Sequence, residues 1–386
     1  MKKGRATQVS PLLQEVCSIP TAPFAEQYVV QYIERFVKER PRLKLSRDQA
    51  GNLLIELPGK SRGRGRGRGS ARGRGRGSRW VFAAHMDHPG FVARRMIDER
   101  TLEAHFRGWV QIDYVRGTKV RFFDAGREIA GTVIEATSST HDRLTVPDLV
   151  KVRVSGPLKP GAPGMFDQGP GRFKGKRFYS RGIDDQGGLA SALAMIDALH
   201  ENPPAAPIAV LLTRAEEEGF IGAIAAVLKP RLLNKTDRII AIECSAMQPY
   251  ARQGDGVIIR VGDKTSIFNS ELTFFLTAEA QNLSKKDKTF RYQRSLMPGG
   301  TCEATVYDVY GYLSAAVCVP LGNYHNMDRT RKKIGPEYID MSDWQNMVKL
   351  FVQIARNGHR FESGFGPLRR RIEKRFRRLE RFLREK

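Results

Sequence analysis

The chain has 386 residues, 41% of them hydrophobic, and this length exceeds the size at which one hydrophobic core keeps growing, so we expect two domains. No apolar run is long enough to cross a bilayer, and the first residues lack the continuous apolar stretch of a signal peptide. Four cysteines without CxxC spacing argue against a disulfide framework and favour a cytoplasmic protein.

The formal net charge of +24 would suit a nucleic-acid-binding protein, so its location matters. Residues 61–79 carry eight arginines and no acid, and residues 368–386 carry ten basic residues against three acidic ones. These two segments therefore hold 15 of the 24 charges. The charge belongs mostly to appendages and does not indicate the chemistry of the remaining chain.

Two helices and a hairpin-like unit are predicted before the arginine-rich segment. Apolar residues recur at helical spacing within residues 8–39, and Pro20 and Pro23 divide this stretch into two helices. Residues 48–52 are typical of a turn, and the apolar residues 53–57 that follow are typical of a strand.

The Arg-Gly run at residues 61–79 has almost no apolar residues, so burial cannot offset the entropy lost on ordering. We expect a disordered insertion between two strands, because a buried-strand pattern resumes at Trp80. Arg-Gly repeats can also bind RNA, but this one lacks interleaved aromatic residues for base stacking. A solvated loop is the favoured interpretation, with RNA binding as the alternative.

Residues 88–175 are rich in short β patterns, which predict a small β-barrel-like domain inserted into a discontinuous domain formed by residues 1–87 and 176–386. The strands expected within it are residues 91–93, 119–123, 132–136 and 150–154. From residue 178 onward, apolar runs of strand length alternate with helical patterns, the clearest being 187–202, 207–213, 221–228 and 238–242. This alternation predicts an α/β fold with a mostly parallel sheet flanked by helices.

Residues 367–386 form a predicted basic amphipathic helix, with apolar residues on one face and arginines elsewhere. Such a helix could dock on the rest of the chain, on a partner subunit or on an anionic surface. Of these, a plain docked helix is expected.

Side chains that can bind metals follow the predicted strands, where ligand sites of α/β sheets gather. His85 follows the strand at Trp80, and Asp87 is close enough in sequence to fix the tautomer of a metal-bound imidazole. Asp184 and Asp185 precede a helix, so helix capping is the alternative explanation for them.

Three further acids, Glu216, Glu217 and Glu218, follow the strand at residues 207–213. One such carboxylate can bind a metal while its neighbour acts as a general base, although a solvated acidic turn would also explain them. Glu243 ends an apolar strand, where an unpaired charge is costly and a salt bridge is the competing explanation. His325 follows another apolar stretch, and alone it would more often be structural.

Seven segments in order resemble the co-catalytic zinc aminopeptidases of the glutamyl-aminopeptidase and tetrahedral-aminopeptidase type: AAHMDHPGF, IDDQGG, LLTRAEEEGFIGA, AIECS, GVIIRVGDKTSI, MPGGTCEA and VPLGNYHNM. The resemblance covers nearly the whole chain apart from the Arg-Gly run and the basic tail. It implies a zinc-exopeptidase-like fold in which the inserted β domain serves assembly and access.

The resemblance also implies a role for each matching residue. His85 and Glu243 would bind one metal ion, Glu217 and His325 would bind the second, and Asp184 would bridge both. These ligand types suit two divalent ions, with zinc expected and cobalt or manganese compatible.

Within the same resemblance, Glu216 would be the general base and Asp87 would orient the first histidine. The implied activity is metal-dependent removal of N-terminal residues from peptides, by a protein that assembles as a dimer or dodecamer. Two alternatives stay open. One is another metal-dependent amidohydrolase on the same scaffold, such as a dipeptidase or deacylase. The less favoured one is an RNA-binding protein that uses the basic segments.

Overall fold

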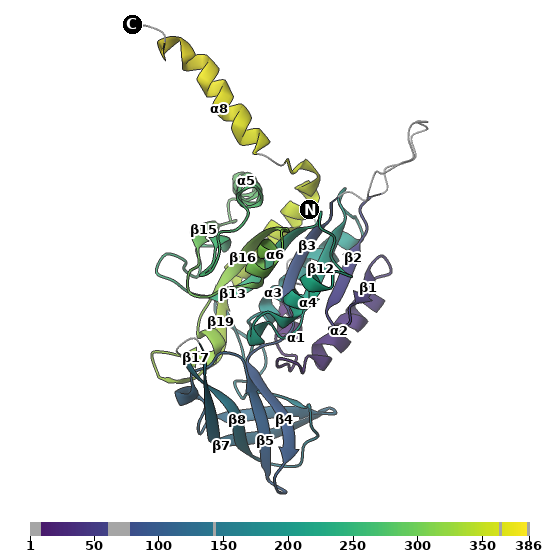
Figure 1. Cartoon of the computed structure of the whole chain (residues 1–386), viewed down its shortest axis with the longest axis vertical. Helices are drawn as coiled ribbons and strands as arrows, with labels where there is room; N and C mark the ends of the chain where they lie inside the picture. Colours follow the sequence, from purple (N-terminus) through teal and green to yellow (C-terminus); the bar gives the residue numbers. More distant parts are fainter. Residues whose placement is uncertain (1–8, 61–77, 142–143, 363–364, 384–386) are drawn as a thin grey trace.

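A computed structural model of the protein describes residues 9–60, 78–141, 144–362 and 365–383. An α/β body carries a small β-barrel at one end, and a single helix projects at the other (Figure 1). The conformation predicted for the Arg-Gly run concerns residues that lie almost entirely outside the described ranges.

The body is built on an eight-stranded sheet with the order β1-β2-β12-β3-β13-β16-β14-β15. Its four central strands, β12, β3, β13 and β16, run parallel, so their carboxyl ends meet at one edge. The strands are β1 Lys44–Arg47, β2 Leu53–Leu57, β3 Trp80–His85, β12 Ile208–Thr213, β13 Arg238–Ala246, β14 Val257–Gly262, β15 Tyr292–Leu296 and β16 Leu313–Leu321.

Helices cover both faces of this sheet, which explains why its central strands are apolar at nearly every position. Successive side chains alternate between two cores: Phe82 faces the core formed with α1, α2, α3, α5 and α7, whereas Val81 faces the core formed with α4 and α6. The helices are α1 Val9–Val16, α2 Gln27–Lys38, α3 Gln186–His200, α4 Ile221–Leu228, α5 Ser270–Lys286, α6 Glu303–Val309 and α7 Met341–Asn357.

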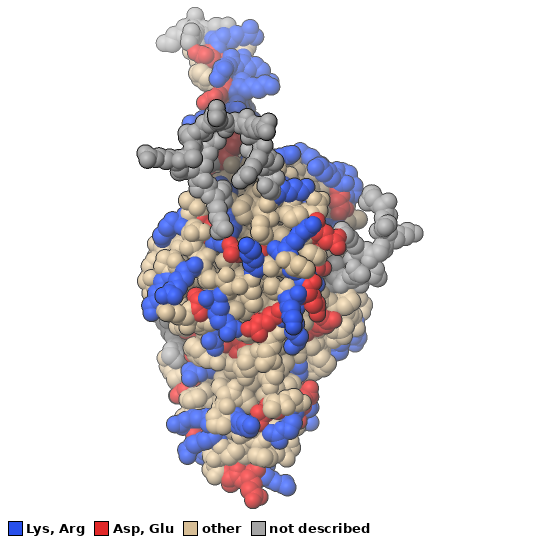
Figure 2. Space-filling view, turned by 90° about the vertical axis from the view of Figure 1, so that its right-hand side faces the viewer, with Lys and Arg blue, Asp and Glu red and all other residues tan. Residues whose placement is uncertain are grey.

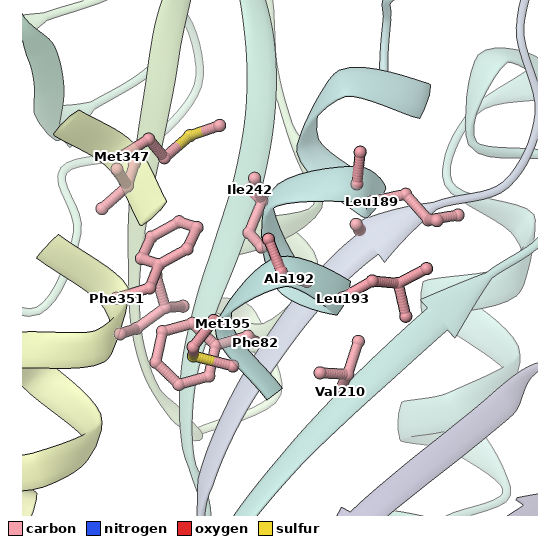
Figure 3. Close-up of a cluster of buried hydrophobic side chains, with 14 of the residues drawn as sticks. Phe82, Leu189, Ala192, Leu193, Met195, Val210, Ile242, Met347 and Phe351 are labelled. Carbon is pink, nitrogen blue, oxygen red and sulfur yellow. The ribbon is translucent and has the colours of Figure 1, made fainter. Parts of the chain in front are cut away.

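The larger core lies between the central strands and the helices α3 and α7 (Figure 3). Its aromatic centre is the pair Phe82 and Phe351, whose ring centroids lie 5.1 Å apart in an edge-on arrangement. Trp344 on α7 donates from its indole nitrogen to the backbone oxygen of Gly187 on α3, at 2.8 Å. These contacts fix α3, and with it the turn that precedes it, against the sheet.

The barrel closes through six antiparallel strands in the order β4-β5-β8-β7-β6-β9. Its core is rich in phenylalanine, and Gly164 is required because a Cβ there would lie 2.5 Å from the ring of Phe122. The strands are β4 Gly90–Met96, β5 Thr101–Arg107, β6 Lys119–Asp124, β7 Arg127–His141, β8 Leu144–Val154 and β9 Pro163–Phe166.

Short sheets join the barrel to the body. The hairpin β17 Met327–Asp328 and β18 Lys333–Ile334 places Met327 and Ile334 in the barrel core. The strands β10 Arg172–Lys174, β11 Arg177–Ser180 and β19 Glu337–Asp340 form a three-stranded sheet. The predicted fold class, a mostly parallel α/β sheet flanked by helices with a small barrel inserted, is confirmed.

The projecting helix is α8, Gly366–Leu379, which continues into a short 3-10 turn, Glu380–Leu383. None of its residues is buried, so the expectation that it docks on the body of its own chain is wrong. No helix in the described part of the chain has both the length and the apolar character needed to cross a membrane.

We expect Phe351→Ala to lower the free energy of unfolding by about 3–5 kcal/mol, because it leaves a cavity beside Phe82 in the larger core. Urea unfolding followed by circular dichroism measures this loss. The matched control is Gln345→Ala on the exposed face of the same helix, which should change stability little. Equal unfolding curves for the two variants would contradict this account of the core.

Candidate active site

The predicted metal-binding residues gather at the carboxyl edge of the parallel strands. His85 is the last residue of β3, and Glu243 lies in β13, two positions beyond the last residue that pairs with β3. Glu216 and Glu217 lie in a 3-10 turn, Glu216–Glu218, which follows β12. The remaining two residues lie in loops at the same edge of the sheet: Asp184 precedes α3, and His325 follows β16.

Asp184 occupies the centre of this cluster. Its Oδ1 lies 3.7 Å from Nε2 of His85, and its Oδ2 lies 3.6 Å from Nε2 of His325. The two oxygens of one carboxylate therefore face two different imidazoles, which is the arrangement required of a ligand shared between two ions. A cis peptide bond joins Asp184 to Asp185.

The remaining carboxylates divide between the two histidines. Glu217 Oε1 lies 3.2 Å from Nε2 of His325, whereas Glu216 Oε2 lies 3.9 Å from Nε2 of His85. Glu243 can share an ion with His85 and Asp184, and Glu217 can share one with Asp184 and His325. A third possible grouping joins Glu216 and Glu217 to His85.

Each residue of the triple glutamate has a different environment. Glu217 faces His325, and Glu216 faces His85. Glu218 points to the barrel, where its carboxylate accepts from the backbone N–H of Gly108 at 2.9 Å and pairs with Arg107 at 3.3 Å. The geometry thus favours Glu217 over its neighbours as the partner of His325.

Asp87 contacts two parts of the site. Its backbone oxygen lies 3.1 Å from Nδ1 of His85, and its carboxylate lies 3.5 Å from the same nitrogen. The carboxylate oxygens also accept from the backbone N–H groups of Glu216 and Glu217, at 3.0 and 3.1 Å. Asp87 therefore holds the glutamate turn in place as well as the imidazole.

A positioning residue that the strand-end pattern missed is Glu337 on β19, which is completely buried. Its carboxylate accepts from the backbone N–H of Asp184 at 3.1 Å and from that of His325 at 2.8 Å. A third bond comes from the N–H of Ile183 at 2.6 Å. One side chain thus fixes both loops that carry the central residues, and only tertiary contact reveals it.

His88 is also buried, but it does not belong to the groups of described side chains that could hold a metal ion. Its Nδ1 lies 2.5 Å from the backbone oxygen of Asp184, and its Nε2 lies 3.0 Å from Oδ1 of Asn326. His88 therefore links the backbone of the Asp184 loop to the side chain of Asn326.

The cluster holds more acidic than basic side chains. The carboxyl groups of Asp184, Glu216, Glu217 and Glu243 are all buried around two imidazoles. Burial raises the pKa of Glu243 to about 8 against the opposing effect of His85. Burial would lower the pKa of the His325 imidazole, but Glu217 and Asp184 outweigh it and raise that pKa well above its ordinary value.

These side chains fit divalent metal ions. Asp184 Oδ1, Glu217 Oε1 and His325 Nε2 are buried and have no hydrogen-bond partner within the described residues. Donor atoms held about 2.1 Å from one tetrahedral ion lie about 3.4 Å from each other, close to the separations of 3.2 to 3.7 Å among Asp184, Glu217 and the two histidines. Carboxylate and imidazole donors suit zinc, manganese or cobalt.

A pocket of about 130 Å³ opens beside Glu217. It lies between the glutamate turn and the barrel, and Phe106, Trp109 and Val146 line part of it. A larger hollow of about 540 Å³ lies near the amino ends of the parallel strands, where Arg79 already pairs with Glu56 and Asp237. Only the smaller of these two touches the cluster.

Comparison with known proteins gives a consistent result. Residues 67–350 match the family model of the M42 glutamyl aminopeptidases. No curated protein sequence matches the chain.

Solved structures with the same fold include a dodecameric form of PhTET1, with 22% identity over 89% of this chain and 98% of that one, at a TM-score of 0.70. The Pyrococcus horikoshii TET1 peptidase, which can form a tetrahedron or a large octahedral shell, is 20% identical. The match covers 90% of this chain and 99% of that one, with a TM-score of 0.70. An aminopeptidase from the archaeon Desulfurococcus kamchatkensis is 19% identical over 91% of this chain and 95% of that one, with a TM-score of 0.71.

Replacing Glu337 with Gln should weaken metal binding about 10- to 100-fold, because an amide nitrogen then faces backbone N–H donors and loosens the loops of Asp184 and His325. Equilibrium dialysis against zinc measures the affinity. The exposed Glu362→Gln serves as the control. Unchanged affinity in the Glu337→Gln variant would remove Glu337 from the positioning role.

Metal binding at neutral pH should release protons, and metal affinity should rise with pH. The carboxylates raise the pKa of both His85 and His325 in the metal-free protein, so protons occupy nitrogens that a metal ion requires. Titration calorimetry in buffers of different ionisation enthalpy measures the release. An apparent enthalpy that is independent of the buffer would contradict the expectation.

Proposed function

This chain belongs to the M42 glutamyl aminopeptidase family and is a metal-dependent aminopeptidase, and we propose that the cluster around Asp184 is its catalytic centre. The proposal assigns His85, Asp184 and Glu243 to one ion and Asp184, Glu217 and His325 to the other. The observation that carries it is the Asp184 carboxylate, whose two oxygens face two separate imidazoles. Zinc is the proposed metal for both positions, with cobalt or manganese as substitutes.

We assign the proton transfers to Glu216. Bound metal ions would polarise the scissile carbonyl and lower the pKa of the attacking water. The Glu216 carboxylate would take a proton from that water and deliver it to the leaving amine. Its position supports the role, because Glu216 is buried beside the cluster but faces His85 less closely than Glu217 faces His325.

The pocket beside Glu217 supports a peptide substrate. Phe106, Trp109 and Val146 give it an apolar wall next to the proposed metal position. We propose that the free N-terminus of the substrate lies against the cluster while part of the peptide occupies this pocket. Cleavage would then be confined to the first residue of a chain.

A different metal-dependent amidohydrolase, such as a dipeptidase or deacylase, would use the same cluster. Activity on aminoacyl-anilides, compared with activity on N-acyl amino acids, separates the two reactions, since only the first class carries a free amine. Hydrolysis of only the N-acyl compounds would contradict the aminopeptidase assignment. The family match offers no support for RNA binding as the main function.

We also propose that the protein forms a homo-oligomer, with the barrel contributing to assembly and access. Related folds assemble as a dodecamer in PhTET1 and as a tetrahedron or octahedral shell in the Pyrococcus horikoshii enzyme. The barrel is joined to the site through Glu218 and through His325, whose Nδ1 lies 2.6 Å from the backbone oxygen of Trp109. Light scattering of the full chain tests the assembly, and a monomer would contradict it.

Glu216→Gln should lower kcat by about 10²- to 10⁴-fold while leaving the metal content intact, because the amide cannot accept the proton. Turnover of an aminoacyl-anilide and metal analysis of the same sample measure both quantities. Glu218→Gln is the matched control, since its amide oxygen can still accept from Gly108 and it faces the barrel. Full activity in Glu216→Gln would exclude it as the base.

A further inference from the structure

The projecting helix α8 and the 3-10 turn that continues it carry an apolar stripe that no described part of the chain covers. Its members recur every three or four residues, and five of them are largely exposed: Ile372 60%, Phe376 52%, Leu379 40%, Phe382 54% and Leu383 78%. Stable monomeric surfaces rarely leave such a stripe in water. The stripe therefore indicates a surface that is covered by something outside this chain.

The start of α8 contacts the α/β body, whereas none of the residues within the helix is buried. Phe365, just before α8, packs edge-on against Phe274 of α5 with ring centroids 6.0 Å apart. Beyond this contact the helix extends away from the α/β body, on the side opposite the barrel (Figure 1). Because of this position, a flat surface can meet the apolar stripe without touching the catalytic edge of the sheet.

The polar side of the helix is strongly basic. Residues 366–383 contain eight arginines or lysines and only two acids, Glu373 and Glu380. Figure 2 shows Lys and Arg side chains predominating on the visible face of this helix. Arg371, Arg375 and Arg378 lie at the same spacing as the stripe, one position away from Ile372, Phe376 and Leu379, so cationic groups border the apolar residues directly.

We propose that α8 binds the surface of a lipid bilayer that contains anionic phospholipids. An amphipathic helix with phenylalanine and leucine on one face and arginine on the other lies in the plane of the interface. Its apolar side chains enter the acyl boundary, and its guanidinium groups bind lipid phosphates. Ile372, Phe376 and Leu383 would be buried in this way, with Arg371 and Arg378 at the headgroups.

Charge argues against the other occupants. Outside residues 61–79 and 368–386, the chain keeps a net charge of +9 out of its total of +24, so a second copy offers no overall acidic surface to this helix. Two copies of α8 packed together would bring their arginines close to one another. A nucleic acid would satisfy the arginines but would leave the apolar stripe in water.

The test uses the full-length protein and sedimentation with vesicles of phosphatidylcholine, with or without phosphatidylglycerol. We expect binding only to the anionic vesicles, and weaker binding as salt is raised. The double variant Ile372→Ser and Phe376→Ser keeps every charge of the helix and of the Arg-Gly run. It should lower the partition coefficient by at least about tenfold, because two side chains no longer enter the apolar layer.

The matched control removes two exposed apolar side chains elsewhere, with Leu228→Ser on α4 and Val309→Ser on α6, which are 57% and 72% exposed. Vesicle binding should be unchanged in the control, and turnover of an aminoacyl-anilide should be unchanged in both variants. Equal vesicle binding by the α8 variant and the wild type would overturn the proposal, because charge alone would then account for it. A fall in oligomer mass in the α8 variant, without vesicle binding by the wild type, would instead assign the stripe to a second copy.

Discussion

The structure depends on an electrostatic constraint: four carboxylates are buried together at the edge of a parallel sheet with only two imidazoles among them. Buried charges without partners cost several kcal/mol each, so these acidic groups bind either protons or cations. Asp184 sets the geometry, because each of its oxygens faces a different histidine. The surplus of buried acids over imidazoles supports the metal site proposed for this edge.

The buried acids around this edge divide into two groups by what they bind. Asp87, Glu337 and Glu26 accept from backbone N–H groups of the loops that carry the site. Asp184 and Glu217 instead each keep a buried oxygen without a hydrogen-bond partner in the described chain. The first group makes the loops rigid, and this rigidity keeps the second group in place for ions. The two groups look alike in sequence, since both are acids near strand ends or in loops.

The barrel and the α/β body meet at the same edge. Glu218 binds the barrel backbone one residue away from Glu217, and His325 contacts the backbone of Trp109. The hairpin that follows His325 buries Met327 and Ile334 in the barrel core. A movement of the barrel would therefore displace His325 and the glutamate turn before the other residues of the cluster. The helix α8 lies at the end of the molecule opposite the barrel, away from the edge that holds the proposed catalytic centre.

The sequence by itself determined the class of the fold and named the candidate residues of the proposed site. Continuous apolar runs such as residues 207–213 favour burial on both faces, which a sheet covered by helices on each side provides, and helical spacing identified α3 and α4 because it reports local geometry. The ordered motifs identified the family. Tertiary structure decided what one-dimensional patterns cannot carry: the separate partners of the three consecutive glutamates, the backbone bonds of Asp87 and Glu337, and the exposure of α8. Each depends on groups far apart in the chain, and a pattern of neighbours contains no information about which distant atoms will meet.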